Sequence, residues 1–283
     1  MTDISRARHY HQDLIGRALF YSGAYRRLLN DRAIVLAYHS ISDDNSPISC
    51  TPKAFRNQCR FFAKYFDVIT LNELIGLLKD SKSLEGKAAI TFDDGYKDNS
   101  EIAADVLVKY ALPATFFVVT RFIDSNHIAW WDEREGIESR WMSWDDLRTL
   151  FAAGFTIGGH TQHHVDLGSV DPDLAQKEIN GCRDDLHSEL GVNCELFAYP
   201  YGGPENINEK SLKFVQQAGF ISCFSCHGGI INPDDNVFEL LRLPISSWHV
   251  SEYHLGAQIM RDFHSAKDDN DPIRDHQQKS IDT

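Results

Sequence analysis

Between residues 33 and 264 the sequence alternates between short apolar runs and longer amphipathic stretches. Runs such as 33–38 are rich in β-favouring residues and are bounded by turn formers, which is typical of buried strands. The stretches between them have helical periodicity, and some open with a cap signal such as Thr51-Pro52. Strands that alternate with helices predict a parallel sheet with helices outside it. About seven such units without a long linker favour one closed barrel over two domains.

The same pattern predicts where the elements and domains lie. An arm over 1–32 precedes a barrel over 33–264, and the polar stretch 265–283 is predicted to be disordered. Residues 124–141 are an excursion rich in Trp and charge. The predicted strands are 33–38, 67–70, 88–92, 113–119, 155–159, 196–199, 220–224 and 240–245, and the predicted helices are 51–66, 71–79, 99–110, 144–153, 171–190, 209–218 and 252–263.

The arm over residues 1–32 is predicted to be a helix with one apolar stripe and many arginines. The stripe consists of Leu14, Ala18, Tyr21, Tyr25 and Leu28, which recur at three and four residues. The helix either packs on the main domain or docks on a membrane surface or a partner. The arm is the only locally basic part of the chain, through Arg6, Arg8, Arg17, Arg26, Arg27 and Arg32.

The charge balance limits the partners of the chain. Its formal net charge is 28 − 41 = −13, which disfavours nucleic acid as a partner because nucleic-acid binding needs a basic face. Six cysteines are too few for a disulfide scaffold. The first residues do not read as a signal peptide, and no apolar run approaches the ~20 residues of a membrane span. We therefore expect a cytoplasmic protein, with membrane association through the arm as an addition.

Titratable side chains follow two of the predicted strands. Asp93 and Asp94 come directly after the strand 88–92, and Gly95 then permits a sharp turn. His160 and His164 follow the strand 155–159 and stand four residues apart, so both can bind one metal ion. Parallel α/β folds place their chemistry at the carboxyl ends of strands. Imidazole and carboxylate together suit zinc or another borderline divalent cation.

These residues carry a resemblance to a known family. The motif at 91–96 (Thr-Phe-Asp-Asp-Gly-Tyr) and the motif at 160–164 (His-Thr-x-x-His) resemble the first two motifs of the polysaccharide deacetylases, the NodB-homology enzymes of carbohydrate esterase family 4. Residues 197–202 are similar to the third motif, and residues 242–245 to a late one. The resemblance spans about 33–264 and implies a distorted (β/α)7 barrel.

The resemblance also implies roles for individual residues. Asp94, His160 and His164 would bind a divalent metal, with zinc favoured, and Asp93 would be the general base. Adjacent carboxylates can divide these roles because neighbouring side chains in extended chain point apart. The metal would polarise the carbonyl of a substrate acetamide and activate water. The backbone N–H of Tyr201 would stabilise the oxyanion, and a protonated His would supply the leaving amine with a proton.

The sequence departs from the family pattern in two places. The third family motif begins with an Arg that orients the base, whereas this chain has Ala198. Arg242, at the end of the last strand, is our candidate for the substitute; the alternative is a surface or core-edge Arg. The Leu-x-Leu-His pattern that supplies the acid in the family is missing. His249 is the nearest candidate and His254 the second, and each could instead be an ordinary surface His.

Other motifs leave two interpretations each. The excursion contains Trp130, Trp131, Asp132 and Trp141. It either forms a wall on which a sugar stacks, with Trp131 in contact with substrate, or packs its own Trp residues into the rim of the barrel. His39 is read as a neighbour of the site or a core residue rather than a ligand. The sequence Cys-Phe-Ser-Cys-His at 223–227 matches a c-type haem attachment pattern, but on a predicted strand we favour two buried thiols.

Three functions remain open at this stage. The leading hypothesis is a metal-dependent hydrolase that removes an acetyl group from an N-acetylated sugar of a polysaccharide or glycan precursor. The first alternative is a hydrolase of another non-peptide C–N bond, such as a ureide, cyclic imide or formamide. The second is a glycan-binding barrel with little or no turnover, which the departures from the family pattern allow.

Overall fold

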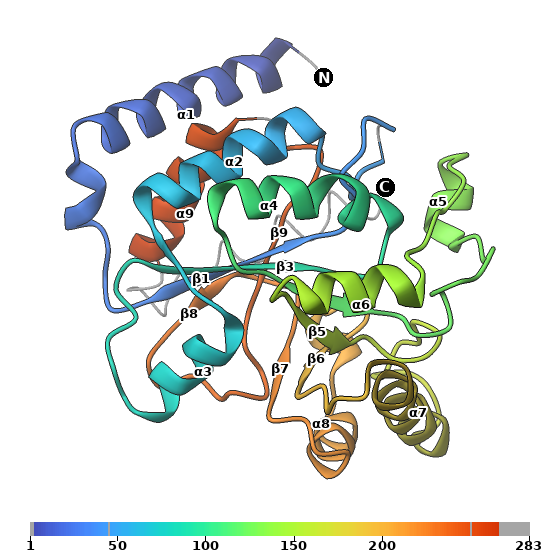
Figure 1. The fold of residues 1–283 in the computed structure, drawn as a ribbon. Helices are drawn as coiled ribbons and strands as arrows, with labels where there is room; N and C mark the ends of the chain where they lie inside the picture. Colours follow the sequence, from blue (N-terminus) through green and yellow to red (C-terminus); the bar gives the residue numbers. More distant parts are fainter. Residues whose placement is uncertain (1–2, 45, 250, 266–283) are drawn as a thin grey trace.

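The computed structural model describes residues 3–44, 46–249 and 251–265 (Figure 1). The tail predicted to be disordered, residues 265–283, lies outside the described residues except for Ser265, the last residue of α9. The strands are β1 Ala33–Tyr38, β2 Asp67–Val68, β3 Lys87–Phe92, β4 Thr115–Val118, β5 Thr156–Gly159, β6 Leu196–Ala198, β7 Ser222–Phe224, β8 Ile230–Ile231 and β9 Leu243–Pro244. The α-helices are α1 Asp3–Tyr21, α2 Pro52–Tyr65, α3 Leu71–Lys79, α4 Ala104–Tyr110, α5 Trp130–Arg134, α6 Trp144–Ala152, α7 Pro172–Leu190, α8 Glu209–Gln217 and α9 Glu252–Ser265. Three shorter helical segments are η1 Ala24–Arg27, η2 Asn99–Ala103 and η3 Pro204–Asn206.

The strands form one curled sheet that nearly closes on itself. Its order is β7-β6-β5-β4-β3-β1-β8, and β1 also pairs in parallel with β9. A parallel bridge between Phe224 of β7 and Leu240, just before β9, joins the two ends of this series. Seven strands, β1, β3, β4, β5, β6, β7 and β9, therefore make a parallel ring in the described residues. The predicted α/β fold, a distorted (β/α)7 barrel, is confirmed.

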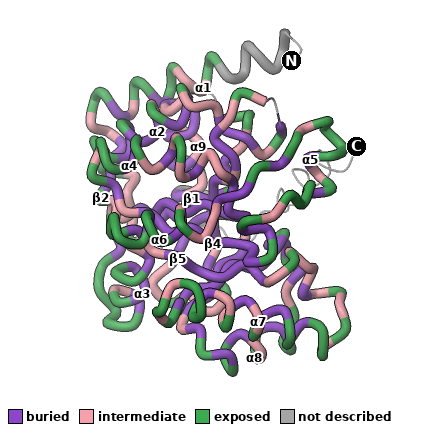
Figure 2. The backbone as a smooth tube through the Cα atoms, turned by 45° about the vertical axis from the view of Figure 1, so that its right-hand side comes forward, coloured by how far each residue is buried: buried purple, intermediate pink, exposed green. Residues whose placement is uncertain are grey.

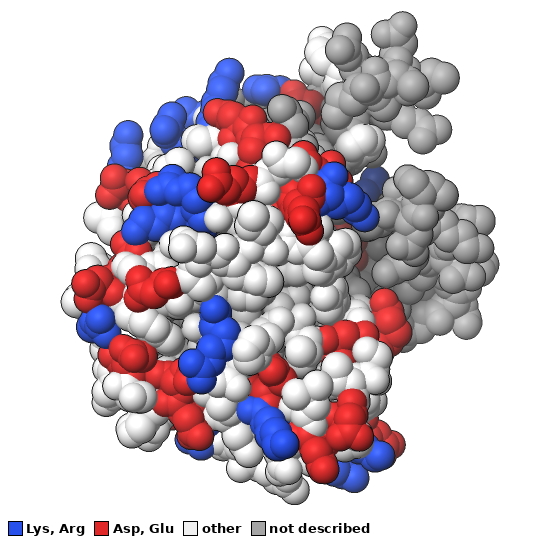
Figure 3. Space-filling model, turned by 90° about the vertical axis from the view of Figure 1, so that its right-hand side faces the viewer, with Lys and Arg blue, Asp and Glu red and all other residues white. Residues whose placement is uncertain are grey.

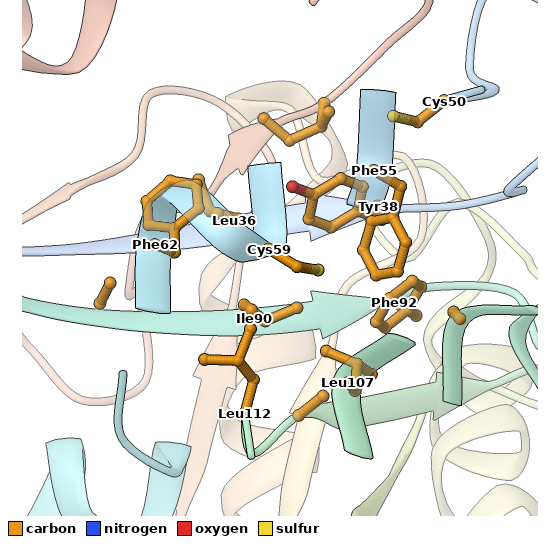
Figure 4. Packing of buried hydrophobic residues seen from close by; sticks show 14 of the residues in the cluster. Leu36, Tyr38, Cys50, Phe55, Cys59, Phe62, Ile90, Phe92, Leu107 and Leu112 are labelled. Atoms are coloured by element: carbon orange, nitrogen blue, oxygen red, sulfur yellow. The ribbon is translucent and has the colours of Figure 1, made fainter. Parts of the chain in front are cut away.

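Helices surround this ring, and the strands inside it consist mostly of buried residues (Figure 2). Apolar side chains of strands and helices together form the core. β1 is buried over its whole length, in agreement with its continuous apolar run. On one side, Tyr38 and Phe92 at the ends of β1 and β3 pack against Phe55 of α2, with Leu107 of α4 close by (Figure 4). This packing fixes the end of β3, which Asp93 and Asp94 follow, against the neighbouring end of β1.

Most predicted elements begin and end within one or two residues of the predicted bounds. For the helices this is because the capping residues that set their ends act over a few residues only. The side chains of Thr51 and Asp171 accept hydrogen bonds from the first turns of α2 and α7. Ser143 and Asp146 form the predicted capping box of α6. The predicted helix 99–110 instead begins as the π-helical η2 and continues as α4.

Three details differ from the predictions. The expected strand 240–245 is reduced to β9 and the bridge at Leu240, since this segment crosses from one end of the sheet to the other. β8 pairs antiparallel with β1 and was not predicted, because two apolar residues carry no readable period. The excursion 124–141 contains the short helix α5.

The N-terminal helix α1 packs on α9 mainly through another face than the predicted stripe, of which Tyr21 stacks on Tyr253 of α9. A Cβ atom on Gly16 would lie 1.9 Å from the carbonyl oxygen of Tyr253, so glycine permits the close contact between the helices. Phe20 is buried beside it, whereas Leu14 and Tyr21 of the predicted stripe are 46% and 65% exposed. Within α1 the predicted stripe therefore faces outward, whereas its continuation is covered: Tyr25 of η1 is buried, and Leu28 packs against the core. The boundary between arm and barrel stays a prediction.

Candidate active site

The site lies at one edge of the ring, where the parallel strands end. Asp93 and Asp94 follow β3, and the N–H of Asp93 donates to the carbonyl of Tyr38 at the end of β1. His160 follows β5, and its N–H donates to the carbonyl of Val118 in β4. These backbone contacts bring side chains from separate parts of the sequence to one place.

Asp94, His160 and His164 converge on one point. The Oδ1 atom of Asp94 lies 3.5 Å from Nε2 of His160 and 3.3 Å from Nε2 of His164. One ligand atom from each of the three residues lies within 4.8 Å of the others, which is the spacing that a shared metal ion requires. The Nδ1 atom of His160 contacts the carbonyl of Ala198 at 2.7 Å, so this nitrogen carries the proton and Nε2 faces Asp94 with its lone pair.

The protonation of these groups also fits a cation. Burial lowers the pKa of His160 to about 4, and burial together with His160 lowers the pKa of His164 well below 6.5. Both imidazoles are therefore neutral at pH 7, as metal ligands must be. Burial and the neighbouring Asp93 raise the pKa of Asp94 well above 3.8, and its Oδ1 makes no hydrogen bond to any described residue. A buried carboxylate without a donor is stabilised by a bound cation, so the donor set suits zinc or a similar ion.

Asp93 is held by Arg242 instead. The two guanidinium nitrogens of Arg242 donate to Oδ1 and Oδ2 of Asp93, each at 2.7 Å, and both side chains are buried. Arg242 also donates to the carbonyl of Ser225 and to the hydroxyl of Thr91. Burial alone would raise the pKa of Asp93, but Arg242 and His160 outweigh it and bring the pKa to about 2. Arg242 thus occupies the position that the sequence assigned to it; its catalytic role stays a prediction.

The loops that carry these residues have strained backbone. Asp94, Thr161, His164 and Tyr201 have φ angles of 69°, 63°, 57° and 63°, in the left-handed region that non-glycine residues seldom adopt. Glu178 of α7 stabilises the histidine loop, since its Oε2 accepts the N–H groups of Gln162 and His163. Glu178 was not predicted as part of the site, because in the sequence a helical Glu looks like an ordinary solvent-facing residue.

Aromatic side chains enclose His164. The rings of Trp131 and Tyr201 each lie 4.7 Å from its ring. The indole N–H of Trp131 donates to the hydroxyl of Tyr96, which donates to the buried carboxylate of Asp132. Trp131 is therefore half-buried beside a metal-ligand candidate. Of the other excursion Trp residues, Trp141 is tucked into the rim with 7% exposure, whereas Trp130 is 54% exposed and donates to the Tyr201 hydroxyl.

The candidates for the acid occupy different surroundings. His249 is buried, and its Nδ1 accepts the N–H of Ser246. His254 contacts Gln12 of α1, so it takes part in holding the N-terminal helix. His39, at the end of β1, is close enough to Asp93 and Arg242 for their charges to act on it; burial lowers its pKa. The acid role of His249 stays a prediction.

The cysteine motif is part of the barrel wall. Cys223 lies on β7 and is fully buried, and burial raises the pKa of its thiol. Cys226 is also a free thiol of raised pKa, next to the site. The buried position of Cys223 agrees with the interpretation of structural thiols and leaves a haem no access to it.

A comparison with protein families now identifies the group. The model of the family described as polysaccharide deacetylase matches residues 80–222, half of the chain. The chain belongs to the polysaccharide deacetylase family. The matched residues include both carboxylates and both histidines of the cluster, but they end before Arg242.

Individual relatives agree with this family. A Bacillus subtilis protein named as a polysaccharide deacetylase is 27% identical over 75% of this chain and 71% of its own length. The poly-β-1,6-N-acetyl-D-glucosamine N-deacetylase of Staphylococcus epidermidis is 25% identical over 70% of this chain and 68% of its own.

Solved structures support the fold. The deacetylase PplD of Streptococcus pyogenes superposes with a TM-score of 0.68 at 22% identity, over 79% of this chain and 96% of the other. IcaB from Ammonifex degensii gives a TM-score of 0.68 at 23% identity, over 81% and 98%. No helix in the described residues is both long and apolar enough to cross a bilayer.

The arrangement predicts how metal affinity responds to substitution. We expect Asp94→Asn, His160→Gln and His164→Gln each to weaken Zn²⁺ binding by more than about 100-fold, because each removes a direct ligand. Asp93→Asn should weaken Zn²⁺ binding by about 100-fold at most, which is the usual effect of losing a residue that surrounds the ligands without binding the metal itself. Titration calorimetry on protein freed of metal measures all four variants. Tight binding by Asp94→Asn, with binding lost in Asp93→Asn, would mean that the two carboxylates have exchanged roles.

Proposed function

We propose that this member of the family is a metal-dependent N-deacetylase that removes acetyl groups from an N-acetylated sugar in a glycan or glycan precursor. The observation that supports it most is the combination of two differently held carboxylates. Asp94 faces two neutral imidazoles, as a metal ligand would, while Asp93 is paired with Arg242 and keeps its charge. Hydrolysis of an amide by activated water needs both a cation site and a separate base.

The base in this proposal is Asp93. When bound, a divalent cation polarises the acetamide carbonyl of the substrate and makes a water molecule acidic enough to be deprotonated near neutral pH. Asp93 takes the proton of that water. Arg242 holds both carboxylate oxygens in a fixed plane and keeps the group ionised far below neutral pH, with its pKa at about 2. The water then attacks the carbonyl carbon.

The backbone N–H of Tyr201 is proposed to stabilise the oxyanion that forms. The left-handed conformation of Tyr201, at the turn after β6, orients this N–H, and within the described residues no acceptor takes it. A preorganised donor of this kind contributes about 3 kcal/mol of transition-state stabilisation in other acyl-transfer enzymes. The ring of the same residue packs on His164, so one residue would serve both the oxyanion and the metal ligand.

The leaving amine needs a proton, and two histidines compete for this role. His249 is the candidate from the sequence; its ring is buried, and its Nδ1 accepts the backbone N–H of Ser246. His39 is a second candidate because it follows β1 at the same edge of the ring, close enough to Asp93 for that charge to act on it.

The substrate class follows from the relatives and from the aromatic surface. Two exposed rings, Trp130 and Tyr201, lie beside the half-buried Trp131 at the rim of the site. Such rings pack on the apolar faces of sugars. The name of the Staphylococcus relative makes β-1,6-linked N-acetylglucosamine the first polymer to test. Hydrolysis of another C–N bond remains the alternative reaction, and binding without turnover the alternative function.

The assay that tests the function is acetate release. We expect metal-loaded protein to release acetate from β-1,6-linked N-acetylglucosamine oligomers, and Asp93→Asn to lower the rate by at least about 100-fold, the usual contribution of a general base. Metal content measured on the same samples shows whether the variant still holds its ion. Ammonia or a ring-opened product from ureides or cyclic imides, without acetate, would support the alternative reaction. Glycan binding without product, unaltered in Asp93→Asn, would support a binding barrel.

The ion pair predicts the pH dependence. A base acts only when ionised, so activity is present above its pKa and is lost as the pH falls through it. Without Arg242, burial is no longer offset and the pKa of Asp93 rises from about 2 to above its ordinary 3.8. Arg242→Gln should therefore move the acid limb of kcat/KM to higher pH, and Arg242→Lys should move it less. The profiles are measured at saturating metal, with circular dichroism to check folding; coincident acid limbs would contradict the assignment.

The acid can be identified through the leaving group. p-Nitrophenyl acetate releases a phenolate that needs no proton, whereas an N-acetylated sugar releases an amine that does. The variant that lacks the acid should lose about 100- to 10,000-fold in amide hydrolysis and keep most of its ester hydrolysis. We expect this split for His249→Gln. If His39→Gln shows it and His249→Gln does not, the proton comes from His39.

A further inference from the structure

The outer face of α1 carries an apolar stripe that the barrel does not cover. Tyr10, Leu14 and Tyr21 are 68%, 46% and 65% exposed, and Ala18 between them is exposed as well. At 100° per residue these four positions lie within an arc of about 80° on the helix. A stripe of exposed tyrosine and leucine on a helix is a feature of surfaces that bind a partner or a membrane.

The contact between α1 and α9 holds this stripe outward. Gly16 approaches the carbonyl of Tyr253 closely, and Phe20 fits against Gly256, where a Cβ atom would lie 2.7 Å from the Phe20 ring. Phe20 also packs edge-on against Phe61 of α2, with ring centroids 4.6 Å apart. Since these contacts use the inner face of α1, the helix cannot rotate its apolar stripe into the core without losing them.

Helix α2, next to α1, carries a basic stripe. Lys53, Arg56, Arg60 and Lys64 are all exposed and lie within an arc of about 80°, and α2 contains no Asp or Glu. Arg26 and Arg27 of η1 are exposed too. The ammonium group of Lys64 lies 5.5 Å from the centre of the Tyr21 ring, so the basic stripe adjoins the apolar one.

This corner differs in charge from the protein as a whole. The chain has a net charge of −13, yet Lys and Arg gather along the upper edge of the molecule, where α1 and α2 lie (Figures 1 and 3). Acidic groups that face the corner are Asp13, 2.6 Å from Arg17, and Glu252, 3.5 Å from Arg60. Both already have a basic partner, so the exposed cations of α2 and η1 outnumber them.

We propose that the combined surface of α1, η1 and α2 docks this protein on an anionic lipid bilayer. The Tyr10–Leu14–Tyr21 stripe would enter the headgroup region, and the α2 cations would contact lipid phosphates. Exposed apolar side chains flanked by Lys and Arg are the combination that interfacial helices use, and an acidic protein needs such a local cation cluster to approach an anionic surface. The inference does not depend on the chemistry of the candidate active site.

Vesicle sedimentation with the full chain tests the proposal. We expect binding to vesicles of 70% phosphatidylcholine and 30% phosphatidylglycerol, and at least about 10-fold weaker binding to pure phosphatidylcholine. Lys53→Gln/Arg56→Gln should weaken binding about five-fold for each charge removed. Neither side chain makes a hydrogen bond or ion pair with another described residue, so this variant should fold normally. Leu14→Gln/Tyr21→Gln should also reduce binding.

Matched controls come from the opposite side of the barrel. Lys177→Gln/Lys213→Gln removes two exposed charges from α7 and α8, and Leu174→Gln removes an exposed apolar group from α7. Both should leave vesicle binding unchanged. Equal binding to both vesicle types, or equal losses in the control and test variants, would overturn the proposal. A dimer that Leu14→Gln/Tyr21→Gln converts to monomer would also overturn it and assign the stripe to a second copy of the chain.

Discussion

The buried ion pair between Asp93 and Arg242 makes two adjacent carboxylates different in charge and surroundings. Two aspartates with buried side chains cannot both remain charged without compensation. Arg242 compensates Asp93 through two hydrogen bonds, and it leaves Asp94 with two uncharged imidazoles and no hydrogen-bond donor among the described residues. The asymmetry of the site thus arises from one guanidinium. Without it, the pair would share protons and neither carboxylate would have a defined role.

The rest of the site is arranged to maintain this asymmetry. Left-handed backbone at Asp94, Thr161, His164 and Tyr201 costs of order 1–3 kcal/mol at each position. Contacts further out offset this cost: β5 holds His160 against Ala198, and Glu178 fixes the loop that follows. The Tyr96–Asp132 pair holds Trp131 against the outer ligand. Strain at the centre is tolerated because the surrounding hydrogen bonds leave the loops few other conformations.

Much of the fold and part of the site could be predicted from local sequence signals. Some signals act over a few residues and can be recognised in the sequence itself: the periodicity of the strands, the caps at Thr51 and Ser143, and the two strand-end motifs. The face that α1 buries could not, since Gly16 has no apolar side chain to mark it and the apolar stripe lies on the opposite face. The contact between Arg242 and Asp93, 149 residues apart, depends on how the ring closes, and only the family resemblance pointed to it. The proximity of His39 and Trp131 to the ligands depends on the same three-dimensional arrangement.

The position of Arg242 on the segment that closes the ring has a consequence for biosynthesis. When the first 230 residues have been synthesised, they include every proposed metal ligand, both carboxylates and six of the seven ring strands. Arg242, which balances the charge of Asp93, has not yet been added. The half-made sheet therefore carries an acidic pair in an apolar setting that only the last forty or so residues can neutralise. Closure of the ring and pairing of Asp93 with Arg242 therefore depend on the same segment, and a chain that stops before Arg242 would hold both strand-end motifs without the guanidinium that keeps Asp93 ionised.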